Sequence, residues 1–178
     1  AGQKALEEAV QEAGYQKTDG YNHMVYDFQT PLEFPLPKGY RFVRPEELDP
    51  KKAAECFWKG FDHEAEEGPF HGDGEDTLRV MLAPHATPCY AVAIAGEGEE
   101  EYACFAGMWW TPENDLAYME PLCTVPEHRH KGLAAAALSE LYRRMKPLGA
   151  THMTGGANPF YRKIGYKPCI ECGYWEKR

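Results

Sequence analysis

The sequence feature that most constrains the fold is the stretch 119–137, which reads MEPLCTVPEHRHKGLAAAA. Its apolar first part predicts a strand, and a short turn containing Pro126 then leads into a helix that opens at Gly132. The predicted helix, 132–146, has an apolar side made of Leu133, Ala137, Leu138, Leu141, Tyr142 and Met145. A strand joined this closely to an amphipathic helix predicts an architecture in which helices pack on a sheet.

The rest of the chain also alternates between strand and helix patterns. Strands are predicted at 21–28, 40–44, 89–95, 102–111, 116–124, 150–155 and 166–175, and further helices at 5–13, 50–61, 78–82 and 159–164. The connectors GEGEEE and TPEND favour antiparallel hairpins among the middle strands. The fold class is therefore α/β (α+β), with antiparallel strands first and a strand–helix–strand crossover later.

Three segments are expected along the chain. Residues 1–28 form a helix–strand extension, 29–39 form a proline-rich linker, and 40–178 form the main domain. The segments Glu12–Phe28 and Lys163–Arg178 echo each other, because each carries two Gly-Tyr pairs before or within an aromatic strand. The echo is either coincidence or a true repeat. If it is a repeat, residues 1–28 are the tail of a preceding copy in a tandem protein.

Charge and hydropathy exclude several classes of function. The net charge is -9, from 19 Lys and Arg against 28 Asp and Glu, which is a poor composition for binding nucleic acid. The chain has no apolar run near the roughly 20 residues of a membrane helix and no apolar signal sequence, so we expect no membrane contact and a soluble, cytoplasmic protein. The acidic surface either is simply solvated or favours a cationic substrate such as an amine. The six cysteines are expected to be reduced.

The turn before Gly132 has the features of a phosphate site. A helix N-terminus offers unpaired backbone N–H groups and partial positive charge, and a glycine lets a ligand approach the backbone closely. Arg129 and Lys131 add positive charge, and His128 and His130 flank Arg129. Competing phosphate motifs are absent from the sequence: no Gly-Lys-Ser/Thr follows a strand, and Gly96-Glu97-Gly98 lacks the third glycine of a dinucleotide fingerprint.

Two motifs carry a resemblance to a known family. Cys123–Ala134 (CTVPEHRHKGLA) resembles motif A of the Gcn5-related N-acetyltransferase (GNAT) superfamily, with Arg129, Gly132 and Ala134 at its fixed positions. Asn158–Tyr166 (NPFYRKIGY) resembles a second signature of the family, at the expected separation. The resemblance covers about residues 40–178. It implies a mixed, mostly antiparallel sheet flanked by helices, with a splay between its two central strands.

The resemblance also implies a cosubstrate and its binding residues. Acetyl-coenzyme A would bind with its diphosphate on the backbone of Arg129, His130, Lys131, Gly132, Leu133 and Ala134. Its pantetheine arm would pair with the strand edge at Leu122, Cys123 and Thr124, and Asn158 would contact the pantetheine or the phosphates. Pro121 cannot donate a ladder hydrogen bond, so it predicts a bulge where the thioester enters. No metal is expected.

The implied reaction is direct attack of a primary amine on the thioester. Tyr161 matches the general acid of the family, and a phenol, with an ordinary pKa near 10, can protonate a departing thiolate whose thiol has a pKa near about 8.5. Glu120 is the candidate base. Each has a plainer alternative, because Tyr161 can be a packing aromatic and Glu120 a surface carboxylate. A non-catalytic acyl-CoA-binding or regulatory module is the alternative to an enzyme.

The acceptor is expected to be a small-molecule or peptide amine of unknown identity, and the sequence indicates no oligomeric state. The aromatic residues Phe57, Trp58, Phe61, Trp109, Trp110 and Tyr118 either shape an acceptor pocket or pack in the core. His63, His71 and His85 lie near the expected acceptor cleft, as a base or as polar surface. Cys169 and Cys172 have CxxC spacing, but nothing in the sequence completes a zinc set.

Overall fold

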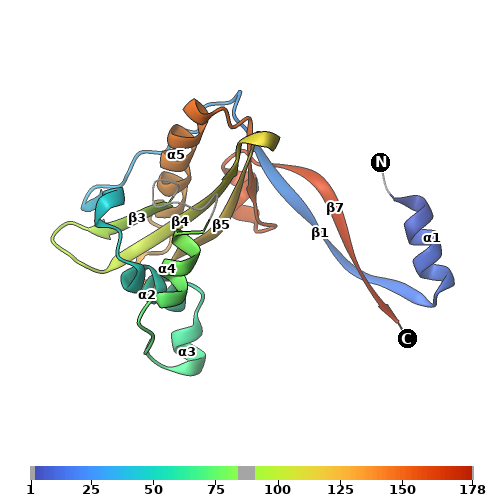
Figure 1. Ribbon diagram of the computed structural model, residues 1–178, viewed down its shortest axis with the longest axis horizontal. Helices are drawn as coiled ribbons and strands as arrows, with labels where there is room; N and C mark the ends of the chain where they lie inside the picture. Colours follow the sequence, from blue (N-terminus) through green and yellow to red (C-terminus); the bar gives the residue numbers. More distant parts are fainter. Residues whose placement is uncertain (1–2, 84–90, 178) are drawn as a thin grey trace. The chain divides into compact units, whose positions relative to one another are not determined.

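The computed structural model describes residues 3–83 and 91–177 (Figure 1). The chain divides into two compact units, and each is described by itself. The first unit combines the N-terminal residues up to Tyr26 with the C-terminal residues from Gly155 on, and the second unit comprises Asp27–Thr154. No helix in the described ranges has both the length and the apolar character needed to cross a membrane.

The second unit is built on a sheet with the strand order β2–β3–β4–β5–β6. Its strands are β2 (Tyr40–Phe42), β3 (Ala91–Gly96), β4 (Tyr102–Thr111), β5 (Leu116–Thr124) and β6 (His152–Gly155). Neighbouring strands are antiparallel, except that β5 and β6 are parallel. Both predicted hairpins are confirmed. The parallel pair is joined through α5 (Leu133–Met145), which is the predicted crossover helix. The mixed, mostly antiparallel sheet flanked by helices is therefore confirmed.

Helices cover both faces of this sheet, and Figure 1 shows α2 (Pro50–Gly60) and α5 on opposite sides of it. Side chains alternate between the faces along a strand. On β3, Ala91, Ala93 and Ala95 belong to the core that includes Ala53 and Cys56 of α2. On α5 the predicted apolar side is buried, with Leu133, Leu138 and Met145 at 1% exposure or less.

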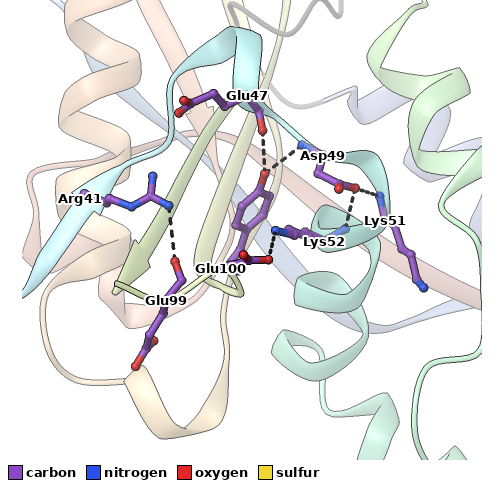
Figure 2. A network of polar contacts seen from close by, with 8 residues as sticks. Arg41, Glu47, Asp49, Lys51, Lys52, Glu99 and Glu100 are labelled. Carbon is purple, nitrogen blue, oxygen red and sulfur yellow. Dashed lines mark hydrogen bonds and ion pairs between the residues drawn. The ribbon is translucent and has the colours of Figure 1, made fainter. Parts of the chain in front are cut away.

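Polar contacts fix the N-terminus of α2. Asp49 caps the helix by accepting hydrogen bonds from the N–H groups of Lys51 and Lys52. The Tyr102 hydroxyl of β4 accepts from the Asp49 N–H at 2.8 Å, and Lys52 pairs with Glu100 at 3.2 Å (Figure 2). The start of α2 is thus tied to the turn between β3 and β4. Its C-terminal end, at Gly60, lies against Cys123 of β5, where a Cβ atom on Gly60 would come within 2.8 Å of the Cys123 Cβ.

The remaining elements in the described part of the second unit are short. They are the 3-10 turns η1 (Pro45–Glu47), η3 (Pro112–Asn114), η4 (Pro126–His128) and η5 (Lys146–Leu148), and the helices α3 (His63–Glu67) and α4 (Glu75–Met81). The sequence pattern missed α3, because HEAEE has no apolar spacing to reveal a helix. Helix α4 begins at Glu75 rather than at the predicted 78. Residues 89–90 of the predicted strand 89–95 lie outside the described residues.

The proline-rich segment predicted as a linker lies within the second unit. Leu32 is buried, and the N–H of Phe34 donates to the Ser139 hydroxyl of α5 at 3.0 Å. Just before it, the Phe28 ring packs against the Tyr142 ring of the same helix, with ring centres 4.7 Å apart. The segment therefore packs along α5. The domain limits at 28 and 39 stay a prediction.

The first unit consists of α1 (Lys4–Glu12), β1 (Tyr15–Asp27), α6 (Pro159–Lys163) and β7 (Lys167–Lys177). Strands β1 and β7 form the antiparallel two-stranded ribbon visible in Figure 1, in which Gly20 lies opposite Gly173. Each strand follows a helix, and a glycine with positive φ lies between the two, Gly14 before β1 and Gly165 before β7. The two echoing segments thus form the same elements and pair at their second Gly-Tyr. The tandem origin itself stays a prediction.

Candidate functional site: an open helix N-terminus beside a strand bulge

The N-terminus of α5 is open. Gly132 precedes the helix with φ 89°, and the first hydrogen bond inside it runs from the Ala136 N–H to the Gly132 carbonyl. Among the residues that the structure describes, the N–H groups of Leu133, Ala134 and Ala135 donate no hydrogen bond, and no side chain caps the helix. The first turn carries no acidic residue. The positive end of a 13-residue helix therefore remains available to an anion.

Two basic residues flank this helix end, and they differ in their partners. The Lys131 ammonium is exposed and lies 6.0 Å from the centre of the Tyr40 ring. The Tyr40 hydroxyl shares a 2.7 Å hydrogen bond with Nδ1 of His128. No carboxylate within the described ranges pairs with Lys131, so its charge is free to act on a ligand. His130 has φ 61°, which gives the turn a second residue with positive φ beside Gly132.

Arg129 is held by its neighbours instead. Its Nε donates to the Thr124 carbonyl at 3.1 Å, and its Nη2 donates to the Gly60 carbonyl at 3.0 Å. The same Nη2 forms an ion pair with Asp62 at 2.8 Å. The guanidinium thus joins the end of β5, the end of α2 and the turn before α5. Its charge is largely balanced by Asp62, while its backbone stays part of the turn.

The end of β5 presents one edge away from β4. The Val125 N–H donates to the Ala103 carbonyl, and residues of antiparallel strands alternate between hydrogen-bonded and non-hydrogen-bonded pairs. Leu122 and Thr124, which lie opposite Ala106 and Cys104, are therefore non-hydrogen-bonded pairs whose N–H and C=O groups point away from β4. Cys123 lies between them, buried against Cys56 with 3.8 Å between the sulfur atoms. Leu122 and the N–H of Thr124 can thus pair with an extended ligand, while the Thr124 carbonyl accepts from Arg129.

β5 bulges at Glu120 and Pro121. The register of β4 and β5 shifts here, so that Glu120 and Pro121 together face Gly107. The Glu120–Pro121 peptide is cis. A Cβ atom on Gly107 would lie 2.5 Å from the Glu120 carbonyl oxygen, which explains why only glycine fits there. The bulge predicted from Pro121 is confirmed, and it turns the exposed Glu120 side chain to the surface.

The β5–β6 ladder ends just before this bulge. It pairs Leu116 with His152 and Ala117 with Met153. Beyond that point the Met119 N–H donates to the hydroxyl of Thr154, a buried side chain of β6, at 2.8 Å. The Thr154 hydroxyl thus takes the place of a backbone carbonyl at the point where the regular β5–β6 ladder ends. The predicted splay between the central strands stays a prediction.

A cavity of about 230 Å³ lies beside the bulge and is lined by residues of α2, α4, β3, β4 and β5, Glu120 and Pro121 among them. Of the aromatic residues expected at an acceptor pocket, Phe57 and Trp109 line it. The others lie elsewhere: Trp110 is buried, Phe61 and Tyr118 are exposed, and Trp58 donates to the Gly68 carbonyl and stacks on the His63 ring.

The histidines expected near the cleft do not line this cavity. His63 pairs with Glu67 at 3.1 Å, and His71 is exposed. His85 lies outside the described residues. The described cysteines are all free thiols, with Cys56, Cys104 and Cys123 buried. No group of three metal-binding side chains occurs within 3–83 and 91–177.

Asn158 and Tyr161 belong to the first unit. The Asn158 side chain caps α6 by accepting from the Phe160 N–H at 2.9 Å. Tyr161 is 8% exposed, and its ring meets that of Tyr166 edge to face, with 5.1 Å between the ring centres. A Cβ atom on Gly155 would lie 2.6 Å from the Tyr161 ring. Both residues have clear local structural roles, and the parts that the resemblance assigns them in binding and catalysis stay predictions.

Sequence reasoning missed several residues that shape the site. Tyr40, Gly60 and Asp62 contact the turn at His128 and Arg129, yet they stand more than 60 residues away in the chain. Gly107 and Thr154 hold the two sides of β5. No local pattern marks these five, because each acts through a partner brought near by the fold. A glycine inside the β4 pattern was the one available signal, since such a residue often marks a bulge.

Comparisons with known proteins bear on the domain type and the fold. A family model described as "Acetyltransferase (GNAT) domain" matches residues 88–168. A search of curated proteins by sequence gave no match.

Among solved structures, a GCN5-related N-acetyltransferase from Sphaerobacter thermophilus aligns with a TM-score of 0.70 at 15% identity, over 97% of this chain and 56% of that one. A GCN5-related N-acetyltransferase from Kribbella flavida aligns with a TM-score of 0.62 at 20% identity, over 96% and 63%. A tandem GNAT protein from the clavulanic acid biosynthesis pathway aligns with a TM-score of 0.68 at 14% identity, over 98% and 58%.

The chain thus spans little more than half the length of the first and third of these structures, and at such identities the likeness is one of fold. The match of the family model adds the domain type to the fold. Residues 88–168 therefore match a GNAT acetyltransferase domain, and the chain has the fold of GNAT structures.

Proposed function

We propose that the chain is an N-acetyltransferase that moves an acetyl group from acetyl-CoA to a primary amine. The observation that carries the proposal is the open N-terminus of α5, where the N–H groups of Leu133, Ala134 and Ala135 have no described acceptor. Such a helix end binds phosphate groups, and coenzyme A brings a diphosphate.

The residues present fit this ligand. Gly132, with φ 89° and an exposed surface, leaves the backbone approachable, and an added Cβ there would meet only one atom within 4 Å. The unpaired cation of Lys131 would complement the diphosphate. The outward backbone groups of Leu122 and the outward N–H of Thr124 would pair with the amide-containing pantetheine arm in the manner of an added strand.

Bound acetyl-CoA would supply a thioester carbonyl as the electrophile. The chain's own residues would position the amine and move protons. Glu120, exposed at the bulge and beside the cavity, would accept a proton from the ammonium group through water, because only the neutral amine is a nucleophile. By the family resemblance, the Tyr161 hydroxyl would protonate the departing thiolate. Positioning of two substrates would supply much of the acceleration.

The diphosphate cradle can be tested by one substitution with a matched control. Ala134→Asp places a negative charge in the first turn of α5, where it favours the helix but repels phosphate. We expect calorimetry to show CoA affinity lowered by about tenfold or more, since one lost charge complement at a helix end amounts to a kcal/mol or more. Ala134→Asn has the same size without the charge and should bind CoA nearly as the parent does. Equal affinity in the two variants would contradict the cradle.

Catalysis needs its own test, because a non-catalytic acyl-CoA-binding module would also pass the binding test. Acetyl-CoA is incubated with a panel of primary amines, and released free thiol is followed. Tyr161→Phe should lower turnover by about 100-fold, the usual range for a lost general acid, while leaving CoA affinity unchanged. Tight CoA binding without thiol release from any amine would favour the binding module instead.

A further inference from the structure

We propose that the cavity beside Glu120 selects a small primary amine with one cationic end and a compact apolar body. This inference rests on the proposed acetyl transfer and specifies its acceptor. It follows from the walls of the cavity, from the charges that face it and from its volume.

The walls of the cavity are mainly apolar. Phe57 of α2 and Phe105 of β4 meet edge to face on one side, with ring centres 4.9 Å apart. Val80 and Met81 of α4 and Met108 and Trp109 of β4 complete the apolar surface. Val80 is 49% exposed, so the apolar wall extends to the mouth. A surface of this kind is complementary to alkyl or aryl groups.

Among the described residues, the charged groups that line the cavity are two carboxylates, those of Asp76 and Glu120. Asp76 pairs with Arg79 of the same helix at 3.0 Å and is highly exposed, so its charge is already balanced. Glu120 has no cationic partner among the described residues. The lining therefore provides one uncompensated negative charge, at the bulge, and a ligand with one cation matches it. The cation would lie next to the strand end where the thioester is proposed to enter.

The volume limits the size of the acceptor. At about 230 Å³ the cavity lies below the roughly 300 Å³ at which pockets for drug-sized ligands begin. A peptide or an aminoglycoside would leave most of its polar surface outside, while an alkyl or aryl-alkyl amine would be largely enclosed. Affinity should then come from buried methylene groups, and each one should raise the affinity by about fourfold.

Three amines that share a six-carbon chain test the inference: hexylamine, 1,6-diaminohexane and 6-aminohexanoate. They differ only in the end that would enter the apolar part of the cavity. We expect kcat/KM for hexylamine to exceed that for each of the others by at least about tenfold, because a second charge would be buried without a partner. From butylamine to hexylamine, kcat/KM should rise by about fourfold for each added methylene. A diamine as good as hexylamine, or a flat alkyl series, would overturn the inference.

A pair of variants assigns the preference to this cavity. Val80→Asp adds a carboxylate to the apolar wall, and Leu78→Asp adds one to the same helix at a residue outside the lining that is similarly exposed, at 43%. In Val80→Asp the ratio of kcat/KM for the diamine over hexylamine should rise by about tenfold or more, since the second cation gains a partner. In Leu78→Asp the ratio should stay that of the parent. Identical ratios in the two variants would place selectivity elsewhere.

The inference and the proposed function fail in different ways. If no amine releases thiol although CoA binds, the proposed function fails. Calorimetric titration of the three amines into the CoA-saturated protein then still decides the cavity's preference. Hexylamine binding that is weakened in Val80→Asp and kept in Leu78→Asp would support the cavity assignment. Absence of hexylamine binding to the saturated protein, or equal binding of all three amines, would refute it.

Discussion

Arg129 has a different role from the one its charge suggests. In the sequence it reads as a cation at the mouth of a phosphate site. In the structure its guanidinium donates to the carbonyls of Thr124 and Gly60 and pairs with Asp62. The residue therefore organises the turn that leads into α5. Lys131, which has no carboxylate partner in the described part of the chain, is the one that keeps its charge available.

This difference predicts separable effects. Arg129→Lys removes the planar guanidinium that donates to two carbonyls and one carboxylate. We expect the free energy of unfolding to fall by about 1 kcal/mol, and CoA affinity to fall with it. Lys131→Gln should lower CoA affinity while leaving the free energy of unfolding within about 0.5 kcal/mol of the parent, since it removes only an exposed charge. Urea unfolding and CoA titration of both variants provide the two readouts. Loss of affinity in Arg129→Lys without loss of stability would show that its charge acts directly on the ligand.

Gly107 supports the bulge from the neighbouring strand. In Gly107→Ala the new Cβ would lie 2.5 Å from the Glu120 carbonyl oxygen, so the backbone at the bulge must move. We expect kcat/KM to fall by at least about tenfold, because a shift of about 1 Å at a reacting centre can cost 100-fold. The control is Gly98→Ala, whose Cβ meets no atom within 4 Å and whose φ is 77°. It should lose about 1 kcal/mol of stability from the positive φ and keep its activity.

At the scale of elements, β5 is the strand on which the proposed site depends. One edge pairs with β4 along most of its length, and the other pairs with β6 only at Leu116 and Ala117. The Thr154 hydroxyl then accepts the Met119 N–H in place of a backbone carbonyl. A single buried side chain thus supports the transition from a paired strand to one with outward backbone groups.

Thr154→Val tests this support with little change in shape. The Met119 N–H would lose its acceptor in a buried setting, and we expect the free energy of unfolding to fall by about 1–3 kcal/mol. Thr154→Ser keeps the hydroxyl and should recover most of the loss. Hydrogen exchange at Met119 gives the local readout, and it should accelerate in the valine variant alone. Unchanged exchange there would mean that the hydroxyl is not the partner that protects this amide.

At the scale of the whole molecule, buried thiol and phenol groups make the free energy of unfolding depend on pH in the alkaline range. Burial raises the pKa of the Cys104 thiol from 9.0 to about 12, and it raises those of Tyr102 and Tyr166 above their ordinary values. The hydrogen bond with Cys123, together with burial, raises the pKa of Cys56. In each case the folded chain holds its proton at a pH where the unfolded chain has lost it. The contribution to stability is therefore complete below pH 9 and declines as the pH rises.

The expected result is a free energy of unfolding that falls above about pH 9, by up to about 1.4 kcal/mol per pH unit for each such group. Urea unfolding between pH 7 and pH 11 measures it. Cys104→Ala should be less stable than the parent at neutral pH yet show a shallower decline, because one of the titrating groups is gone. An equal slope in the two proteins would mean that this thiol titrates alike in the folded and unfolded chains.

The sequence by itself determined the features that depend on neighbours along the chain. Local spacing and turn chemistry gave the two hairpins, the amphipathic helix after Gly132 and the bulge at Pro121. The same local residues gave the two family motifs. The ends of elements were predicted less accurately. β1 begins at Tyr15 rather than at 21, because its first residues are exposed and carry no strand pattern. α3 was missed for the same reason.

The tertiary structure alone decided which distant residues meet. The partners of Arg129 at Gly60 and Asp62, the glycine opposite the bulge and the walls of the cavity beside Glu120 come from elements far apart in the sequence. Such contacts arise from the packing of helices on both faces of a sheet, where each position depends on all the others. The sequence thus specifies the pattern of chemistry along one strand and one helix, and the fold selects the neighbours that surround it.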